Sequence, residues 1–308
     1  MPKIAVNCWQ CPGDTLSLSA TIYSIAKLYP DQFKFRFHGI CPDLYNNYPW
    51  LYTGHGYDSQ WKPEYGHTIC RSCNANDPQT PVNFLECYAH DWNTKYPSFP
   101  VTLVTSTPHI YLTDSEQICK YNKPYIVMST SHKKDYEVKQ WSWDKWQEVA
   151  DYVQSLGYWV YHVGEINKSW HCHKPLEGKR VVNLIGKTGG NKNSNTGTIR
   201  DYIALCYHAS FGLSHESLLN HILSSTFHTN GSQKIGIPCV VIKSGWNSNW
   251  VQYPTSRVIH RHGVLNCCRL GGCWKAKLKD CPNNHRCMTS ISVQDVVREV
   301  ELVHQSLS

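Results

Sequence analysis

No hydrophobic run in the sequence approaches the roughly 18 apolar residues that a bilayer-spanning helix needs. The N-terminus, MPKIAVNCW, lacks the basic region, apolar core and small-residue cleavage site of a signal peptide. Internal repeats are also absent. These absences predict a cytoplasmic location, which includes the inner face of the membrane.

Charged residues are sparse at 17% of the chain, while apolar residues make up 41% of it. This balance is typical of a soluble globular protein, and 308 residues favour two domains with sizeable cores. Basic residues outnumber acidic ones by 30 to 23, which gives a net charge of +7. The excess predicts a polyanionic partner or a phosphate-bearing substrate, and a generally solvated basic surface is the alternative interpretation.

Short β-rich segments alternate with helical patterns along the whole sequence. Strands are expected in PKIAVNCW, FKFRFHGI, YIVM, YWVYHVG, VVNLIG, FGLSH, PCVVIK and SRVIH, and helices in residues 17–28, 143–156 and 292–308, VNFLECYAHDWNTKY and TIRDYIALCYHA. This alternation predicts an α/β fold with parallel sheets. We expect domains at residues 1–122 and 123–292 and a closing helix at 293–308, with ligands bound between the domains at the carboxyl ends of strands.

The first candidate site residue is Asp14, in the Pro-Gly-Asp turn between the first expected strand and the first expected helix. A helix N-terminus favours the charged form of a nearby carboxylate, which is then available as a base. The competing interpretation is a helix N-cap.

A basic loop, STSHKKDYEVKQWSW, follows the expected strand YIVM and carries Lys133, Lys134 and Lys139. Lysines at the carboxyl end of a strand are suited to binding a diphosphate through charge-assisted hydrogen bonds. A solvated basic loop is the alternative.

The segment SHESLLNHI places Glu216, Ser217 and His221 at an expected strand-to-helix junction. A helix N-terminus with a hydroxyl is suited to phosphate, and a carboxylate there is suited to ribose hydroxyls. A structural histidine in an apolar helix is the simpler interpretation of His221.

Fifteen cysteines favour buried thiols or metal ligands in a cytoplasmic chain. Five of them fall within 267–287, and four of the five would suffice to hold zinc or iron tetrahedrally. The spacing is not that of two regular Cys-x-x-Cys pairs, so free thiols remain the alternative. The five are Cys267, Cys268, Cys273, Cys281 and Cys287.

In their order and spacing, several segments together resemble glycosyltransferase family 9, the ADP-heptose:lipopolysaccharide heptosyltransferase relatives. The resemblance covers nearly the whole chain. The cysteine-rich tail of the chain resembles the metal finger of bacterial autotransporter heptosyltransferases, which carry iron. The segments that carry it are PGDTLSLSATIYSIAKLYP, KQWSWDKWQEVADYVQSLGYWVYHVGE, NLIGKT, the Glu-Ser-x-x-x-His segment before IPCVVI, and GGCWK with RCMTSISVQDVV.

The resemblance implies a GT-B fold, with an acceptor-side and a nucleotide-sugar-side Rossmann-like domain, and a closing helix that crosses back to the first domain. It makes Asp14 the catalytic base and Lys139, helped by Lys133 or Lys134, a contact of the donor diphosphate. Two departures stand out, because Glu216 replaces the family's Asp and Leu218 stands in place of Gly, which restricts close approach of backbone to phosphate. The donor-binding residues implied are Lys133, Lys134, Lys139, Gly164, Glu216, Ser217 and His221.

The function implied is inverting transfer of a hexosyl or heptosyl group from a nucleotide sugar to an acceptor hydroxyl. The sequence has no Asp-x-Asp motif, which fits chemistry without a catalytic divalent metal, and the cysteine site is then structural. The expected acceptor is a lipopolysaccharide or another surface glycan. Two alternatives are kept: a phage-type enzyme acting on 5-hydroxymethylated pyrimidines in DNA, and a non-catalytic protein that binds a nucleotide sugar or nucleic acid. The sugar, the nucleotide and the oligomeric state are left open.

Overall fold

The computed structural model describes residues 3–8, 11–51, 62–65, 82–134, 137–165, 171–188, 198–245, 247–261, 264–265 and 277–307. Within these residues the strands form four sheets, two of which carry the α/β pattern predicted from the sequence. None of the helices in the described part of the chain is long and apolar enough to cross a membrane.

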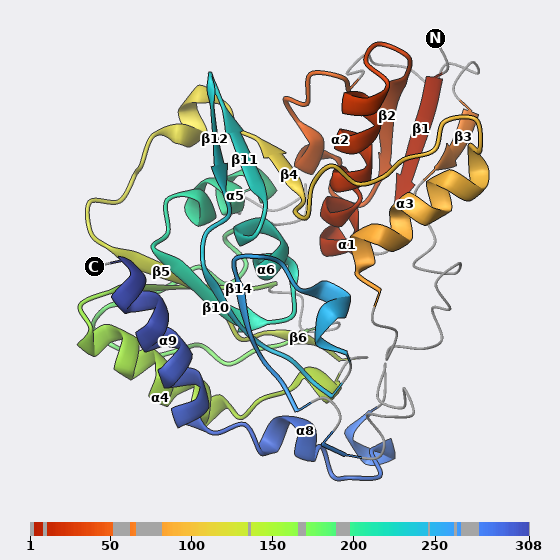
Figure 1. Ribbon diagram of the computed structural model, residues 1–308. Helices are drawn as coiled ribbons and strands as arrows, with labels where there is room; N and C mark the ends of the chain where they lie inside the picture. The colour runs from red at the N-terminus through yellow and green to blue at the C-terminus, as the bar shows by residue number, and fades with distance from the viewer. Residues whose placement is uncertain are drawn as a thin grey trace.

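The first sheet contains three parallel strands in the order β2-β1-β3, and it lies apart from the larger sheet in Figure 1. Its helices begin with α1, which starts directly after β1 because Pro12 suits the first turn of a helix. The helix expected from residue 17 therefore starts earlier and is interrupted at Leu18. The elements are β1 (Lys3–Cys8), α1 (Pro12–Ser17), α2 (Ser19–Leu28), β2 (Lys34–Gly39), β3 (Lys62–Tyr65) and α3 (Phe84–Lys95).

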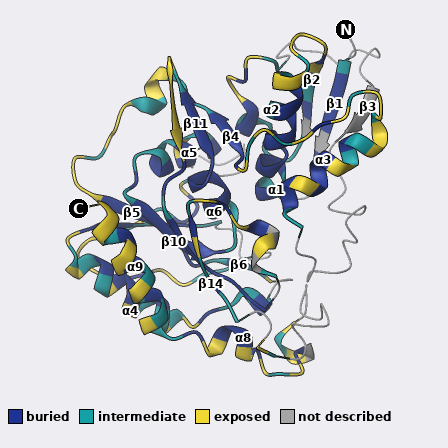
Figure 2. Cartoon of the chain, in the orientation of Figure 1, coloured by how far each residue is buried: buried dark blue, intermediate teal, exposed yellow. Residues whose placement is uncertain are grey.

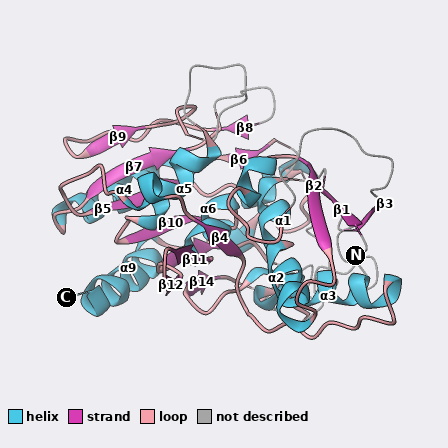
Figure 3. Ribbon diagram, turned by 90° about the horizontal axis from the view of Figure 1, so that it is seen from above, coloured by secondary structure: helices cyan, strands magenta, loops and turns pink. Residues whose placement is uncertain are grey.

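The second sheet contains six parallel strands in the order β14-β13-β10-β5-β7-β9, and Figure 3 shows β9, β7, β5 and β10 side by side. Each strand was predicted. The strands are β5 (Tyr125–Ser129), β7 (Trp159–Val163), β9 (Val181–Asn183), β10 (Phe211–His215), β13 (Cys239–Ile242) and β14 (Ser256–Ile259).

Helices cover both faces of this sheet, which explains why its central strands are almost wholly apolar. Ile126 and Met128 of β5 pack with the helices α4 (Trp143–Ser155) and α9 (Val293–Leu307). Tyr125 and Val127, which alternate with them, pack with α5 (Ile199–Tyr207) and α6 (Leu218–Leu223). Figure 2 shows β5, β10 and α6 buried, with exposed residues on the outer sides of α4 and α9.

The resemblance implied that the closing helix crosses back to the first domain. In the structure α9 packs against the second sheet instead. Its apolar stripe, formed by Val296, Val300 and Val303, is buried in the same cluster as Trp146 of α4. The helix α9 also contacts β13 and β14. The spacing of these valines gives α9 one apolar face, and α4 and the second sheet together bury that face.

A small third sheet joins the two halves of the chain and was not predicted. The strand β4 (His109–Tyr111) pairs in parallel with β11 (Thr226–Thr229), which forms a hairpin with β12 (Ser232–Ile235). The remaining short elements are the strands β6 (His132–Lys133) and β8 (His171–Cys172), the 3-10 helices η1 (Pro42–Tyr45), η2 (Asp114–Gln117), η3 (Glu137–Lys139), η4 (Ser248–Val251) and η5 (Leu278–Asp280), and α8 (Arg286–Thr289).

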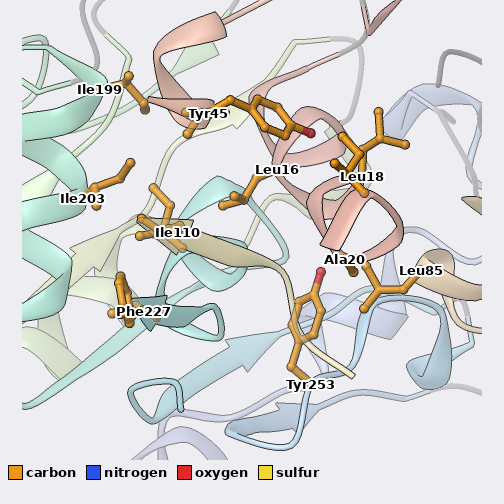
Figure 4. Close-up of a cluster of buried hydrophobic side chains, with 14 of the residues drawn as sticks. Leu16, Leu18, Ala20, Tyr45, Leu85, Ile110, Ile199, Ile203, Phe227 and Tyr253 are labelled. Carbon is orange, nitrogen blue, oxygen red and sulfur yellow. The ribbon is translucent and has the colours of Figure 1, made fainter. Parts of the chain in front are cut away.

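One hydrophobic cluster runs from the first sheet into the second. Leu16 and Ala20, near the start of the chain, belong to the same buried cluster as Ile203 of α5 and Phe227 of β11. Figure 4 shows these side chains around β4, with Tyr253 beside Leu85 of α3. The first half of the chain is therefore held to the second by apolar packing, and the expected boundary at residues 122–123 stays a prediction.

Candidate active site

Polar side chains from both halves of the chain gather where α1 contacts α6. The contact is close, because a Cβ atom placed on Gly13 would lie 2.7 Å from Cδ2 of His221. Glycine at this position lets α1, which carries Asp14, approach α6. Five predicted residues fall in this region: Asp14, Lys139, Glu216, Ser217 and His221.

Asp14 is the third residue of α1, and Cys11 occupies the N-cap position that was the alternative reading of Asp14. The Oδ2 atom of Asp14 accepts two hydrogen bonds from Cys11, at 3.2 Å from the backbone N–H and 2.8 Å from the thiol. The Oδ1 atom accepts no hydrogen bond from any described residue. One carboxylate oxygen is thus anchored to the helix, while the other is available for a substrate proton.

Burial raises the pKa of Asp14 above the usual range of an aspartate. The hydrogen bonds from Cys11 and the positive charges of Lys133 and Lys139 lower it again, but only in part. A carboxylate with a raised pKa is a stronger base, which suits proton abstraction from a hydroxyl.

Lys139, at the end of η3, and Glu216, which follows β10, were each predicted as donor-binding residues, and they lie close together. The Nζ atom of Lys139 donates a hydrogen bond of 3.0 Å to the backbone oxygen of Glu216 and lies 3.9 Å from its Oε1. Lys133 is half-buried and acts on Asp14 through its charge. Lys134 is exposed and makes no hydrogen bond or ion pair with the described residues, so the structure does not bring it into this cluster.

Ser217 and His221 have different surroundings. The Ser217 hydroxyl is inaccessible to solvent and has no hydrogen-bond partner among the described residues, a costly arrangement that a ligand would relieve. The Nδ1 atom of His221 lies 2.6 Å from the Tyr253 hydroxyl and 3.1 Å from that of Ser17, which belongs to α1. Burial lowers the pKa of His221 to about 4 against the opposing charge of Glu216, so the ring is neutral and links the two halves.

The expected phosphate site at the start of α6 is weaker than the sequence suggested. The helix has only six residues and begins at Leu218, whose partly buried side chain packs on the core. A short helix contributes little dipole, so the lysines carry most of the positive charge in this region. Gly164 lies farther along the sheet, where a Cβ atom would come within 3.1 Å of the Ser131 hydroxyl.

Lys243 is a site residue that sequence reasoning missed. Since Ile242 of β13 pairs with His215 of β10, Lys243 follows β13 as Glu216 follows β10. Its side chain is only 1% exposed. Burial lowers the pKa of Lys243 to about 8, with Glu216 opposing this shift and Lys139 adding to it. The signal in the sequence was a lysine that ends the buried strand PCVVIK.

The predicted metal ligands are only partly described. Cys281 and Cys287 are buried, and the Cys281 sulfur accepts a hydrogen bond of 3.2 Å from the backbone N–H of His285. Cys267, Cys268 and Cys273 lie outside the described residues. Among the residues that the structure describes, no three histidine, cysteine or acidic side chains are grouped to hold a metal ion.

No protein-family model and no curated protein matched the sequence. Solved structures did match over its whole length. A glycosyltransferase family 9 protein from Veillonella parvula gives a TM-score of 0.68 at 13% identity, covering 99% of this chain and 98% of its own. The iron-containing dodecameric glycosyltransferase TibC from enterotoxigenic E. coli gives 0.64 at 16% identity, covering 100% and 77%.

A third similar structure, the E. coli ADP-heptose lipopolysaccharide heptosyltransferase II, gives a TM-score of 0.60 at 12% identity and covers 100% of both chains. At these identities the likeness establishes the fold. The chain has the α/β, GT-B type fold of the family 9 heptosyltransferases, as the sequence motifs indicated.

Proposed function

We propose that the protein is a glycosyltransferase that moves a sugar from a nucleotide-sugar donor to an acceptor hydroxyl with inversion at the anomeric carbon. The observation that carries this proposal is the juxtaposition of one available carboxylate oxygen on Asp14 with a group of lysines. A base and a set of phosphate-binding cations are the two things that such a transfer requires. The GT-B type fold supports the same conclusion.

In the proposed reaction, Asp14 removes the proton of the acceptor hydroxyl through its Oδ1 atom. The acceptor oxygen forms a bond to the anomeric carbon as the bond from that carbon to the diphosphate oxygen breaks. The electron pair of the breaking bond leaves with the nucleoside diphosphate. Attack from the face opposite the leaving group inverts the configuration.

Lys139 and Lys243 are the proposed cations for the departing diphosphate. Both act electrostatically on the same neighbours, His221 and each other, and both lie beside Glu216. Cations fixed before the reaction stabilise the growing negative charge without reorganising. Glu216 is then left to bind hydroxyls of the donor, and the Ser217 hydroxyl supplies one further polar contact.

We propose a glycan as the acceptor and ADP-heptose as the first donor to test. The donor choice rests on the similar structures, since TibC was solved with ADP-D-β-D-heptose and another is an ADP-heptose lipopolysaccharide heptosyltransferase. The net charge of +7 suits a phosphorylated glycan. It also suits DNA, and therefore hydroxymethylated DNA belongs in the same experiment as an alternative acceptor.

The test is mass spectrometry of reactions that combine a panel of nucleotide sugars with lipopolysaccharide core and with hydroxymethylated DNA. We expect transfer to the glycan and slow hydrolysis of the donor when no acceptor is present. Asp14→Asn should lower transfer by at least about a hundredfold while the donor still binds. Asp31→Asn is the matched control, because Asp31 is exposed and adopts a positive φ that asparagine tolerates.

Three outcomes would change the conclusion. Normal transfer by Asp14→Asn would remove Asp14 as the base. Transfer to DNA alone would replace the glycan acceptor. Donor binding without any turnover across the panel would favour the non-catalytic alternative.

A further inference from the structure

We propose that Cys11 is a positioning residue whose thiol holds the Asp14 carboxylate in its reactive orientation. The inference rests on the proposed function, because it assigns Cys11 a task in the same proton transfer. It depends on the contact between the two side chains and not on any metal or redox chemistry. Cys11 itself touches neither the acceptor nor the donor in this proposal.

The geometry of the contact is specific. Both the thiol and the backbone N–H of Cys11 donate to the same oxygen, Oδ2, at 2.8 Å and 3.2 Å. Two donors on one oxygen fix the rotation of the carboxylate, so that Oδ1 is the oxygen presented to a substrate. The backbone bond belongs to the helix start and would survive any substitution of the side chain, whereas the thiol bond would not.

The thiol is a permanent donor in this position. Burial raises the pKa of Cys11 far above that of an ordinary cysteine, and the charge of Asp14 raises it further. The group therefore stays protonated throughout the range in which an enzyme works. A thiolate in its place would repel the carboxylate instead of orienting it.

A thiol also differs usefully from a hydroxyl. A hydrogen bond to the ionised form lowers the pKa of a carboxylate, and the bond from Cys11 has this effect on Asp14. Because S–H is a weak donor, it orients the carboxylate while reducing its basicity only slightly. Serine would orient Asp14 equally well but would make it a weaker base.

The first test measures how the contact with Asp14 affects the reactivity of the Cys11 thiol in the free protein. Iodoacetamide is added at pH 8, and alkylation of each cysteine is followed by peptide mass spectrometry. Cys11 should react at least about tenfold more slowly than the exposed Cys119. Asp14→Asn removes the neighbouring negative charge and should accelerate alkylation of Cys11 about threefold, leaving Cys119 unchanged. An equal rate for Cys11 in both proteins would overturn the proposal.

The second test measures how Cys11 affects Asp14 as a base. It follows the pH dependence of kcat/KM for hydrolysis of the nucleotide sugar that the donor panel identifies. In Cys11→Ala the acid limb of kcat/KM should move up by about half a pH unit, which lowers the rate on the acid side about threefold. In Cys11→Ser it should move down. Identical acid limbs in the parent and both variants would refute the positioning role.

The two tests separate this proposal from the proposed function. If no nucleotide sugar is consumed, the alkylation experiment still decides whether Cys11 and Asp14 are coupled. If sugars are consumed but the alkylation rates do not differ, the proposed function stands and the role of Cys11 falls.

Discussion

At the scale of single residues, the site places a buried lysine beside a carboxylate and a second lysine. Lys243 occupies a position on β13 where its ammonium group is almost wholly removed from water. Removing a charge from water is costly, and the neighbouring charge of Glu216 offsets part of that cost. This burial fits the donor-binding role proposed above for Lys243.

Lys243→Met should therefore separate stability from function. We expect the melting temperature to be unchanged or higher, because a buried charge is replaced by a side chain of similar shape. Donor affinity should fall about ten- to hundredfold, since a hydrogen bond to a charged group is lost. Calorimetric titration with the donor and thermal melts give both readouts. Lys179→Met, at an exposed lysine, is the control and should alter neither.

The same lysine predicts an alkaline limit for donor binding. Because the pKa of Lys243 is lowered to about 8, its charge is present below that pH and is lost as the pH rises through it. Affinity for the donor in the parent should fall above about pH 8, and in Lys243→Met it should not depend on pH in this range. A parallel decline in both proteins would show that another group is responsible.

Asp14 predicts the acid limit. Its pKa is raised, so the fraction that is ionised falls at a higher pH than it does for an ordinary aspartate. The value of kcat/KM should decline as the pH falls, with a midpoint above the ordinary aspartate value of 3.8. A midpoint at or below that value would contradict the burial seen around Asp14.

Sequence alone singled out Asp14, Lys139 and Glu216 as candidates, because each follows a predicted strand at its carboxyl end, and the structure places the three in one region. It missed Lys243 and the positioning role of Cys11 for physical reasons. Lys243 ends a strand whose pattern indicates only burial, and its importance depends on the register of β13 beside β10. Cys11 matters through a contact of its side chain within one helical turn, which no spacing rule distinguishes from an ordinary N-cap.

At the scale of elements, one ion pair ties η2 to α5. Arg200 donates from Nε to Oε1 of Glu116 at 2.7 Å and from Nη2 to Oε2 at 2.5 Å, and it also bonds the backbone oxygen of Tyr111 in β4. Both side chains of the pair are only 12% exposed. Because the pair is bidentate and buried, its disruption should lower the free energy of unfolding.

Glu116→Gln should lower the free energy of unfolding by about 2 kcal/mol at neutral pH. Desolvation raises the pKa of Glu116, but the hydrogen bonds from Arg200 and Thr113 and the Arg200 charge outweigh it, so the net pKa is lowered. The stabilisation is therefore present above the unfolded pKa and is lost as the pH falls through the folded one. Denaturant melts at neutral and acid pH should show that the difference in free energy of unfolding between parent and variant becomes smaller as the pH falls.

The exposed pair of Arg257 and Glu299 provides a matched control. Its atoms are 2.6 Å apart, but the arginine side chain is 42% exposed. Glu299→Gln should therefore cost at most about 1 kcal/mol. Equal losses in Glu116→Gln and Glu299→Gln would mean that burial does not set the strength of these pairs.

We propose that the cysteine-rich segment holds a structural zinc or iron ion. Support comes from the burial of Cys281 and Cys287. The Cys281 sulfur also accepts a hydrogen bond from the backbone N–H of His285, and such a donor is suited to a thiolate. Cys281→Ser should lose the metal and melt at a lower temperature, while Cys119→Ser should do neither. Elemental analysis that finds less than about 0.2 equivalents of zinc plus iron in folded protein would exclude this site.

The sequence pattern predicted the six-stranded sheet but not the small third sheet. Every strand of the six-stranded sheet was predicted, because its central strands are short, buried apolar runs that alternate with helical patterns. The third sheet was missed, since the partner strand of β4 is more than a hundred residues away along the chain. The hairpin of β11 and β12 was predictable in principle, because Asn230–Gly231 is a strong turn signal.

At the scale of the whole molecule, the shared hydrophobic cluster predicts that the two halves unfold together. Leu16, Ile203 and Tyr253 are buried in one cluster although they come from distant parts of the chain. Separating the halves would expose this apolar surface, which costs about 25 cal/mol for each Å². Scanning calorimetry should show a single transition, and two well-separated transitions would contradict the prediction.

The pairing of β4 with β11 also bears on how the protein is made. While the ribosome has synthesised only the first 122 residues, β4 has been completed but its partner strand has not. Synthesis at about 5–20 residues per second leaves that edge unmatched for several seconds. The newborn chain therefore passes through a stage in which a strand edge and the apolar side chains beside it are open to chaperones.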